Sequence, residues 1–154
     1  CMRILVLSDS HRHNFNLFSA ITEEPTAEVV YFLGDGANEF EEAQLIYGKE
    51  QAFIGVRGNC DMSSFLPTKD IRTICGKKIL ATHGYEQNVK FGLIDLQLEA
   101  VSEKCDIVLY GHTHIPLSTY KDGIYYFNPG SLKEGCYGVI DITPNGIICI
   151  NKKL

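Results

Sequence analysis

The chain has 154 residues, 45% of them hydrophobic and 21% charged, and carries a formal net charge of -5. This composition excludes disordered and fibrous proteins, and the length predicts one domain, residues 1–154, without a separate cap domain. Stable nucleic-acid binding is not expected, because contact with a phosphate backbone needs clustered Lys and Arg.

Alternating strand and helix patterns occupy the first two thirds of the chain. Apolar runs rich in β-branched residues predict buried strands over 3–7, 28–33, 51–56, 78–81 and 106–110. Helical patterns lie between them over 14–22, 38–47 and 88–104. Strands that alternate with helices predict βαβ units and a largely parallel sheet.

The last third has a different pattern, with short strand-like runs over 125–127, 137–142 and 146–150. Turn sequences such as Asn145-Gly146 separate them, and Asn-Gly between apolar runs is a strong hairpin signal. A further hairpin is expected where 71–75 leads into 78–81. We expect the C-terminal region to form a second, antiparallel sheet packed on the first.

Six cysteines show no CxxC pair and no regular spacing. We therefore expect reduced thiols, and neither a zinc ribbon nor a disulfide framework. The first hydrophobic run, 4–7, is too short for a signal peptide or a membrane span. These features predict a cytoplasmic protein that does not associate with membranes, and they leave homo-oligomer formation open.

Metal-competent side chains follow five of the apolar runs by one to three residues: Asp9, Asp35, Asn59, His83 and His112. Ligands in open α/β sheets gather outside the carboxyl ends of the strands, so we expect these side chains to converge. His11 and His114 follow at i+2, on the same side of an extended segment.

Each piece alone also has an ordinary structural interpretation: a Gly-Asp turn, a capping Asp or a loop histidine. Their joint occurrence at strand ends favours a metal centre. Mixed oxygen and imidazole ligands suit Zn, Mn, Fe or Ni better than Ca, without selecting among the four. A carboxylate such as that of Asp35 can bridge two cations about 3.5–4 Å apart.

The motifs DSH, GD, GNCD, THG and GHTH, in this order over 9–114, resemble those of the calcineurin-like metallophosphoesterase superfamily. The NPGS segment over 128–131 resembles that of the small single-domain phosphodiesterases of the YfcE and archaeal type. The resemblance implies a two-layer sandwich of mixed β-sheets flanked by helices, which is a four-layer α/β/β/α arrangement. It also implies a dinuclear metal centre at one edge of this sandwich.

The resemblance further implies two groups of metal ligands that share Asp35 as a bridge: Asp9, His11 and His114 in one, and Asn59, His83 and His112 in the other. Two divalent ions (Mn, Ni, Zn or Fe) would generate a bridging hydroxide for in-line attack on phosphorus. Asp35 and Asn59 are the catalytic candidates, because Asn59 could also donate a hydrogen bond to the phosphate. The expected activity is that of a metal-dependent phosphodiesterase acting on a small phosphate ester.

The chain departs from the family pattern beside the ligands. Cys60 stands where many members have the histidine that protonates the leaving group, and we expect it to be a small packed residue. Asp61 is expected to orient its loop, to hydrogen-bond a ligand histidine or to cap a helix. Tyr85 and the Arg12-His13 pair differ from the common residues, which affects the expected substrate contacts and not the metal ligands.

Two other functions remain as alternatives. A phosphomonoesterase or nucleotide hydrolase could use the same metal centre. A protein-interaction scaffold like the small retromer subunit would share the fold but have a degraded metal site. The ligand positions separate the scaffold from the enzymes, because here all seven carry a metal-competent side chain.

Overall fold

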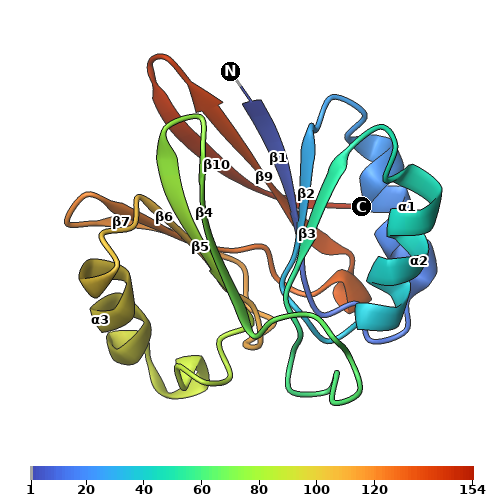
Figure 1. Ribbon diagram of the computed structural model, residues 1–154, viewed down its shortest axis with the longest axis horizontal. Helices are drawn as coiled ribbons and strands as arrows, with labels where there is room; N and C mark the ends of the chain where they lie inside the picture. The colour runs from blue at the N-terminus through green and yellow to red at the C-terminus, as the bar shows by residue number, and fades with distance from the viewer. Residues whose placement is uncertain (1) are drawn as a thin grey trace.

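Two five-stranded mixed β-sheets pack face to face, with helices on both outer surfaces, in the computed structural model, which describes residues 2–154 (Figure 1). The first sheet has the spatial order β10 (Gly146–Lys153), β9 (Cys136–Thr143), β1 (Met2–Leu7), β2 (Val29–Phe32) and β3 (Ala52–Gly55). The second has the order β4 (Lys69–Ile74), β5 (Lys77–Thr82), β6 (Ile107–Leu109), β8 (Ile124–Asn128) and β7 (Leu117–Lys121). The implied two-layer sandwich is therefore confirmed.

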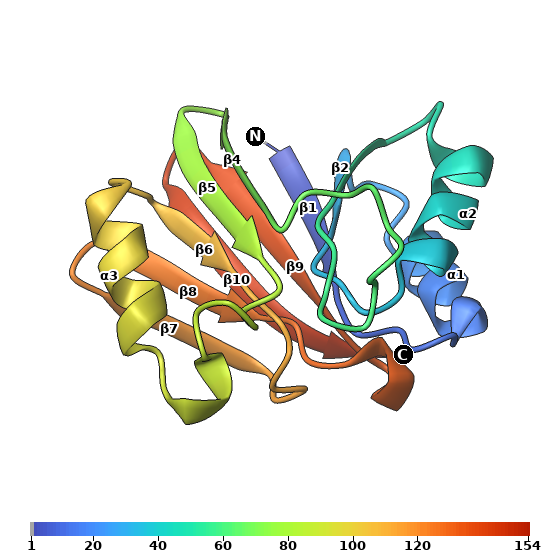
Figure 2. The ribbon, with the colours of Figure 1, turned by 60° about the horizontal axis from the view of Figure 1, so that its bottom comes forward.

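Strands at the centre of each sheet are apolar on both faces because both faces are covered. In β1, Ile4 and Val6 face the second sheet, while Leu5 and Leu7 pack under the helices. Helices α1 (Asn14–Glu23) and α2 (Ala37–Tyr47) cover the first sheet. Helix α3 (Ile94–Ser102) covers the second, on the opposite side of the molecule (Figure 2).

The expectation of a separate, antiparallel C-terminal sheet is wrong. The hairpin of β9 and β10 forms, but β9 pairs antiparallel with β1 and so completes the first sheet. The reason is that β9 is apolar on both faces, with Val139 under the helices and Ile140 between the sheets. Such a strand must lie inside a sheet that is covered on both sides. Strand β8 instead pairs parallel with β6 in the second sheet.

The helix expected over 88–104 is interrupted. A 3-10 helix, η1 (Val89–Phe91), precedes Gly92, whose φ of +126° lies outside helical space, and α3 starts at Ile94. Leu96 and Ala100 still form the buried face that the spacing predicted. Phe91, on the same apolar helical pattern, is 92% exposed because η1 and the break at Gly92 direct it to solvent.

No helix within residues 2–154 is long and apolar enough to cross a membrane. The five cysteines in this part of the chain are free thiols, and Cys1 lies outside it. The remaining short helix, η2 (Leu132–Glu134), follows the NPGS segment and packs beside α1 and β9.

Candidate metal centre

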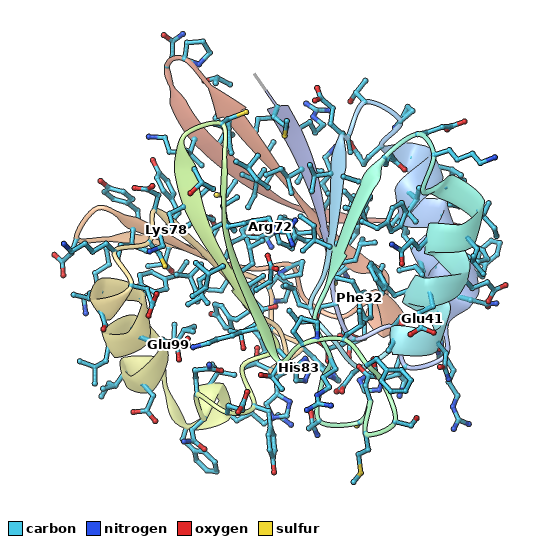
Figure 3. All side chains as sticks on the ribbon, in the orientation of Figure 1. Phe32, Glu41, Arg72, Lys78, His83 and Glu99 are labelled. Atoms are coloured by element: carbon cyan, nitrogen blue, oxygen red, sulfur yellow. The ribbon has the colours of Figure 1, made fainter. Side chains whose placement is uncertain are left out.

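The predicted ligands lie at one edge of the sandwich, where strands of both sheets end. The first sheet contributes the residues after β1, β2 and β3, and the second contributes those after β5 and β6. Figure 3 shows His83 at the end of β5, where the two sheets approach each other. Parallel strands deliver their carboxyl-terminal loops to a common edge, which explains why residues far apart in sequence meet here.

The loops at this edge have a strained backbone. Of the ten non-glycine residues with positive φ in residues 2–154, six belong to these loops: Asp9, His11, Arg12, Asp35, His112 and His114. Such conformations are costly for L-residues and persist where the surrounding structure fixes them, often at functional sites. Asp9 and His11 thus converge through left-handed turns and not through the extended segment that we expected.

Hydrogen bonds between loops hold this backbone in place. The N–H of Asp9 donates to the Gly34 carbonyl at 2.9 Å, and the N–H of His11 donates to the Asp35 carbonyl at 3.0 Å. The loop after β1 is therefore tied to the loop after β2. This tie fixes the relative positions of two candidate carboxylate ligands.

Glycines precede several candidate ligands because the backbone there runs close to other atoms of the site. A Cβ on Gly58 would lie 2.1 Å from Asp35 Oδ1, and a Cβ on Gly111 would lie 2.9 Å from Asp9 Oδ2. Gly34 has a φ of +104°, and a Cβ there would lie 2.5 Å from the backbone nitrogen of Gly58. The glycines of the Gly-Asp, Gly-Asn and Gly-His pairs are thus a steric requirement of the site.

The first ligand group consists of Asp9, His11 and His114, whose candidate ligand atoms all lie within 4.8 Å of one another. Asp9 Oδ1 is 3.3 Å from His114 Nε2 and 3.7 Å from His11 Nε2. The two Nε2 atoms are 3.2 Å apart. Asp9 is fully buried while both imidazoles are partly exposed, so this group opens towards solvent.

The second group consists of Asp35, His83 and His112, again with ligand atoms within 4.8 Å of one another. His83 Nε2 lies 3.2 Å from Asp35 Oδ2, 3.1 Å from His112 Nδ1 and 3.0 Å from Asn59 Oδ1. The other ring nitrogen, Nδ1, is 2.6 Å from the Leu33 carbonyl, to which it donates as N–H. Metal-binding histidines are commonly oriented in this way, with the second nitrogen facing the site.

The donor set has the chemistry of a cation site. Asp35 Oδ2 is 3.8 Å from His11 Nε2 and 3.2 Å from His83 Nε2, so its carboxylate faces both groups. Asp9 Oδ2 accepts a hydrogen bond from the Ser8 hydroxyl at 2.6 Å, whereas Asp9 Oδ1 is buried without a hydrogen-bond partner. An unpaired buried anionic oxygen is costly. Paired imidazole nitrogens at this distance also require a proton or a cation between them. The residues therefore fit divalent metal ions.

Charges in the site shift the pKa values of its groups in opposite directions. Burial would raise the pKa of Asp35, but the hydrogen bond and charge of His83 hold that pKa well below its usual range. Burial would lower the pKa of His83, yet the hydrogen bond to Asp35 and the charge of Asp9 raise it. The close approach of the Asp9 carboxylate raises the pKa of His114, while burial and the charge of His83 lower the pKa of His112. Metal ions would replace protons held by these carboxylates and imidazoles.

Asp61 organises the loop that carries Asp35. Its Oδ2 accepts from the N–H groups of Asp35 and Gly58 at 2.7 and 2.8 Å, and its Oδ1 accepts from Gly36 and Ala37, each at 3.1 Å. A carboxylate is favourable at this place because it meets the N-terminus of α2. The expected loop-orienting role is confirmed. Within residues 2–154, no ligand histidine is among the hydrogen-bond partners of Asp61. The alternative in which Asp61 hydrogen-bonds a ligand histidine is therefore wrong.

Sequence reasoning assigned no role to the NPGS side chains, which support two ligand loops. Asn128 Nδ2 donates to Thr113 Oγ1 at 2.9 Å, inside the GHTH segment. The Ser131 hydroxyl donates to the carbonyl of Asp9 at 2.9 Å. Both residues are fully buried and hold the loops that carry candidate ligands. The NPGS motif is the sequence signal that could have identified Asn128 and Ser131 as residues that support the site.

Cys60 is exposed, so our expectation of a packed residue is wrong. Its backbone N–H donates to Asp35 Oδ1 at 2.9 Å, which places it at the mouth of the site. Partial desolvation of the sulfur and the charge of Asp35 raise the pKa of the thiol. On this side the site opens into a hollow of about 190 Å³, which Arg12 also lines.

A larger cavity of about 340 Å³ lies on the other side of the loop after β3. Asn59 and His83 line it next to the second ligand group, together with Arg57, Met62 and Tyr85. Tyr85 is 58% exposed and contacts the His112 ring edge to face, with the centroids 5.5 Å apart. The cavity therefore combines a cationic and an aromatic side chain beside candidate metal ligands.

Comparison with known proteins identifies the family. The calcineurin-like phosphoesterase superfamily domain matches residues 2–143. The chain belongs to this superfamily. As a calcineurin-like phosphoesterase it is a hydrolase of phosphate esters, as the sequence motifs predicted, and the family implies divalent metals.

The superfamily assignment agrees with individual relatives. Phosphodiesterase MJ0936 of Methanocaldococcus jannaschii is 31% identical, and the match covers 99% of this chain and 95% of the relative. A Streptococcus pneumoniae structure described as a predicted phosphoesterase superposes with a TM-score of 0.78 at 23% identity, covering 98% of each chain. Vps29 of Entamoeba histolytica in complex with Zn²⁺ superposes with a TM-score of 0.73 at 17% identity, covering 99% of each chain. At these identities the two structures establish the shared fold alone.

Proposed function

We propose that the protein is a phosphodiesterase that uses two divalent cations, Mn, Ni, Zn or Fe, at the edge shared by its two sheets. The observation that carries this proposal is the meeting of the two ligand groups at Asp35, whose Oδ2 faces His11 and His83. The unpartnered, buried Asp9 Oδ1 supports it further. MJ0936, which the match covers almost completely, is named a phosphodiesterase.

The proposed reaction is in-line hydrolysis of a phosphoester bond. When bound, the cations would acidify water and neutralise charge on the phosphoryl oxygens. Asp35 would hold the two cation sites in register, because its carboxylate faces both groups. Asn59 is exposed, and its Oδ1 is turned towards His83. Its Nδ2 donates one hydrogen bond, to Cys60 Sγ at 3.8 Å, so the second Nδ2 hydrogen could donate to a phosphate oxygen.

The second ester group would occupy the cavity of about 340 Å³ beside Asn59. Arg57 lines this cavity, and its guanidinium makes one hydrogen bond, from Nη1 to the Ser64 carbonyl at 3.3 Å. We propose that its other N–H groups contact the ester, and that Tyr85 packs against an aryl or base moiety. Because Cys60 replaces the usual histidine acid, substrates whose leaving groups need little protonation are expected to react fastest.

The competing function is that of a phosphomonoesterase or nucleotide hydrolase with the same centre. We predict that bis(p-nitrophenyl) phosphate is hydrolysed faster than p-nitrophenyl phosphate, which has the same leaving group, after metal supplementation. The cavity beside the ligands favours the diester because it can hold a second ester group. Measurement of kcat/KM for both compounds decides the matter, and faster hydrolysis of the monoester would overturn the diesterase assignment.

The scaffold alternative rests on the Vps29-like fold and is disfavoured by the intact ligand positions. It makes a different prediction, namely that the protein needs no metal. If equilibrium dialysis detected no bound Mn²⁺, Zn²⁺, Ni²⁺ or Fe²⁺, the scaffold would become the better hypothesis. The phosphodiesterase proposal requires divalent metal bound to the described site.

We further propose that the chain functions as one domain in the cytoplasm, on a small phosphate ester and without stable nucleic-acid binding. Both sheets contribute candidate ligands, so the site requires the two sheets to be packed together. Free thiols throughout residues 2–154 are compatible with a reducing compartment. The net charge of -5 disfavours contact with a nucleic-acid backbone.

A further inference from the structure

A third cluster of metal-ligating side chains overlaps the proposed centre and includes a sulfur atom. His11, Asp35 and Cys60 each offer a ligand atom, and these atoms lie within 4.8 Å of one another. The N–H of Cys60 donates to Asp35 Oδ1, which anchors the backbone of Cys60 beside that carboxylate. The sulfur therefore lies near His11, a member of the first ligand group, and it accepts a hydrogen bond from Asn59 Nδ2 at 3.8 Å.

Cys60 Sγ adds a potential metal ligand next to a group in which one buried carboxylate oxygen has no hydrogen-bond partner. The buried Asp9 Oδ1, without a hydrogen-bond partner, lies 3.7 Å from His11 Nε2, which is itself 3.8 Å from Asp35 Oδ2. His11 thus belongs both to the first ligand group, with the unpaired Asp9 oxygen, and to the cluster that contains Asp35 and Cys60. The Cys60 side chain is exposed, so small rotations of it towards a cation meet no packed core.

We propose that Cys60 Sγ is an additional ligand of the cation held by Asp9, His11 and His114, and that it biases this site towards thiophilic metals. The inference rests on the proposed metal-dependent function. On binding, the S–H bond of the thiol breaks, a sulfur–metal bond forms, and the proton leaves to solvent without any change of oxidation state.

The consequence is a specific order of metal preference. Thiolate ligands favour Zn²⁺ and comparable softer ions, whereas Mn²⁺ prefers carboxylate, carbonyl and water oxygens. With Cys60 in place, the first site should hold Zn²⁺ or Co²⁺ more tightly than a centre built only from oxygen and imidazole. Mn²⁺ should gain little from the sulfur.

The test is a titration of the metal-free 154-residue chain with Co²⁺, followed by absorption spectroscopy. Thiolate ligation produces a near-ultraviolet sulfur-to-cobalt charge-transfer band, which oxygen and imidazole ligands do not give. We expect this band in the parent protein and its loss in Cys60→Ser. Cys75→Ser is the matched control, because Cys75 is also exposed but lies in the turn between β4 and β5.

Competition binding provides a second readout. In Cys60→Ser and Cys60→Ala, the ratio of Zn²⁺ to Mn²⁺ affinity should fall at least about tenfold, since even residues behind metal ligands contribute about that much. Bound Mn²⁺ in the variants also shows that they remain folded.

The outcomes separate this inference from the proposed function. Metal binding without the charge-transfer band, or a band that persists in Cys60→Ser, would overturn the role of Cys60 and leave the phosphodiesterase proposal standing. Failure of the parent protein to bind any divalent metal would overturn both.

Discussion

At the residue scale, several candidate ligands have backbone conformations that are energetically unfavourable. Asp9, Asp35, His11, His112 and His114 all have positive φ, although none of them is glycine. Each such residue typically costs about 1–3 kcal/mol. Packing and hydrogen bonds between the loops must supply this energy, which explains why buried Ser131 and Asn128 stand behind the ligands. The strain is consistent with a preorganised metal centre.

The proposed bridging role of Asp35 leads to the first prediction. Asp35→Asn should lower turnover by more than about 100-fold and reduce bound metal, because an amide is a far poorer bridge between two cations. Metal content by mass spectrometry and kcat on a diester are the measurements. Asp95→Asn, on the exposed side of α3, is the control and should behave like the parent. Retention of a large fraction of parental turnover in Asp35→Asn would contradict the assignment.

The pair of Asp35 and His83 predicts how the stability of the metal-free protein depends on pH. The raised pKa of His83 gives stabilisation that is complete below the unfolded value of about 6.5 and is lost as pH rises through the folded value. The lowered pKa of Asp35 gives stabilisation that is present above its unfolded value of about 3.9 and is lost only in stronger acid. The pair should therefore stabilise the fold most between these two values.

Urea denaturation of metal-free parent and His83→Gln tests this window. The difference in unfolding free energy between the two proteins should be largest near about pH 6 and should shrink as pH rises further. A difference that grew between neutral and alkaline pH would show that His83 is not stabilised in its charged form.

At the element scale, one carboxylate joins the loops after β2 and β3 to the N-terminus of α2. Asp61 accepts four backbone N–H groups, two of which belong to the first turn of α2 and the residue before it. Asp61→Ala should lower the unfolding free energy by about 3 kcal/mol, because it leaves several partly buried donors without an acceptor. Chemical denaturation measures this loss.

The control for Asp61 is another half-buried aspartate with a single backbone partner. Asp106 Oδ2 accepts only the N–H of Lys78, at 2.9 Å, so Asp106→Ala should cost about 1 kcal/mol. If both variants lost the same stability, Asp61 would not have the organising role that its hydrogen bonds indicate.

Elements were predictable from sequence where one periodicity dominated. The buried strands and the first two helices were expected at close to their observed positions, because apolar runs and helical spacing are local signals. The break at Gly92 was missed because the apolar spacing of Val89, Leu96 and Ala100 continues across it. Strand β7 was missed because it lies at a sheet edge with mostly exposed residues and has no apolar run.

At the scale of the whole molecule, sequence reasoning recovered the layers but not all the pairings. The partner of β9 is β1, more than 100 residues earlier, and no local pattern specifies such a pairing. The candidate ligands could be brought together by prediction because their motifs are short and follow strand ends. The positions of Cys60 and Phe91 were not, because their exposure depends on loop geometry that spacing does not encode.

The central claim is that seven residues from both sheets hold two divalent cations. Crystals grown or soaked with Mn²⁺ test it most directly, through the anomalous scattering of the metal. We predict two peaks about 3.5–4 Å apart, one beside Asp9 and His114 and one beside His83 and His112, with Asp35 between them. A single peak, or metal bound only away from these residues, would contradict the account.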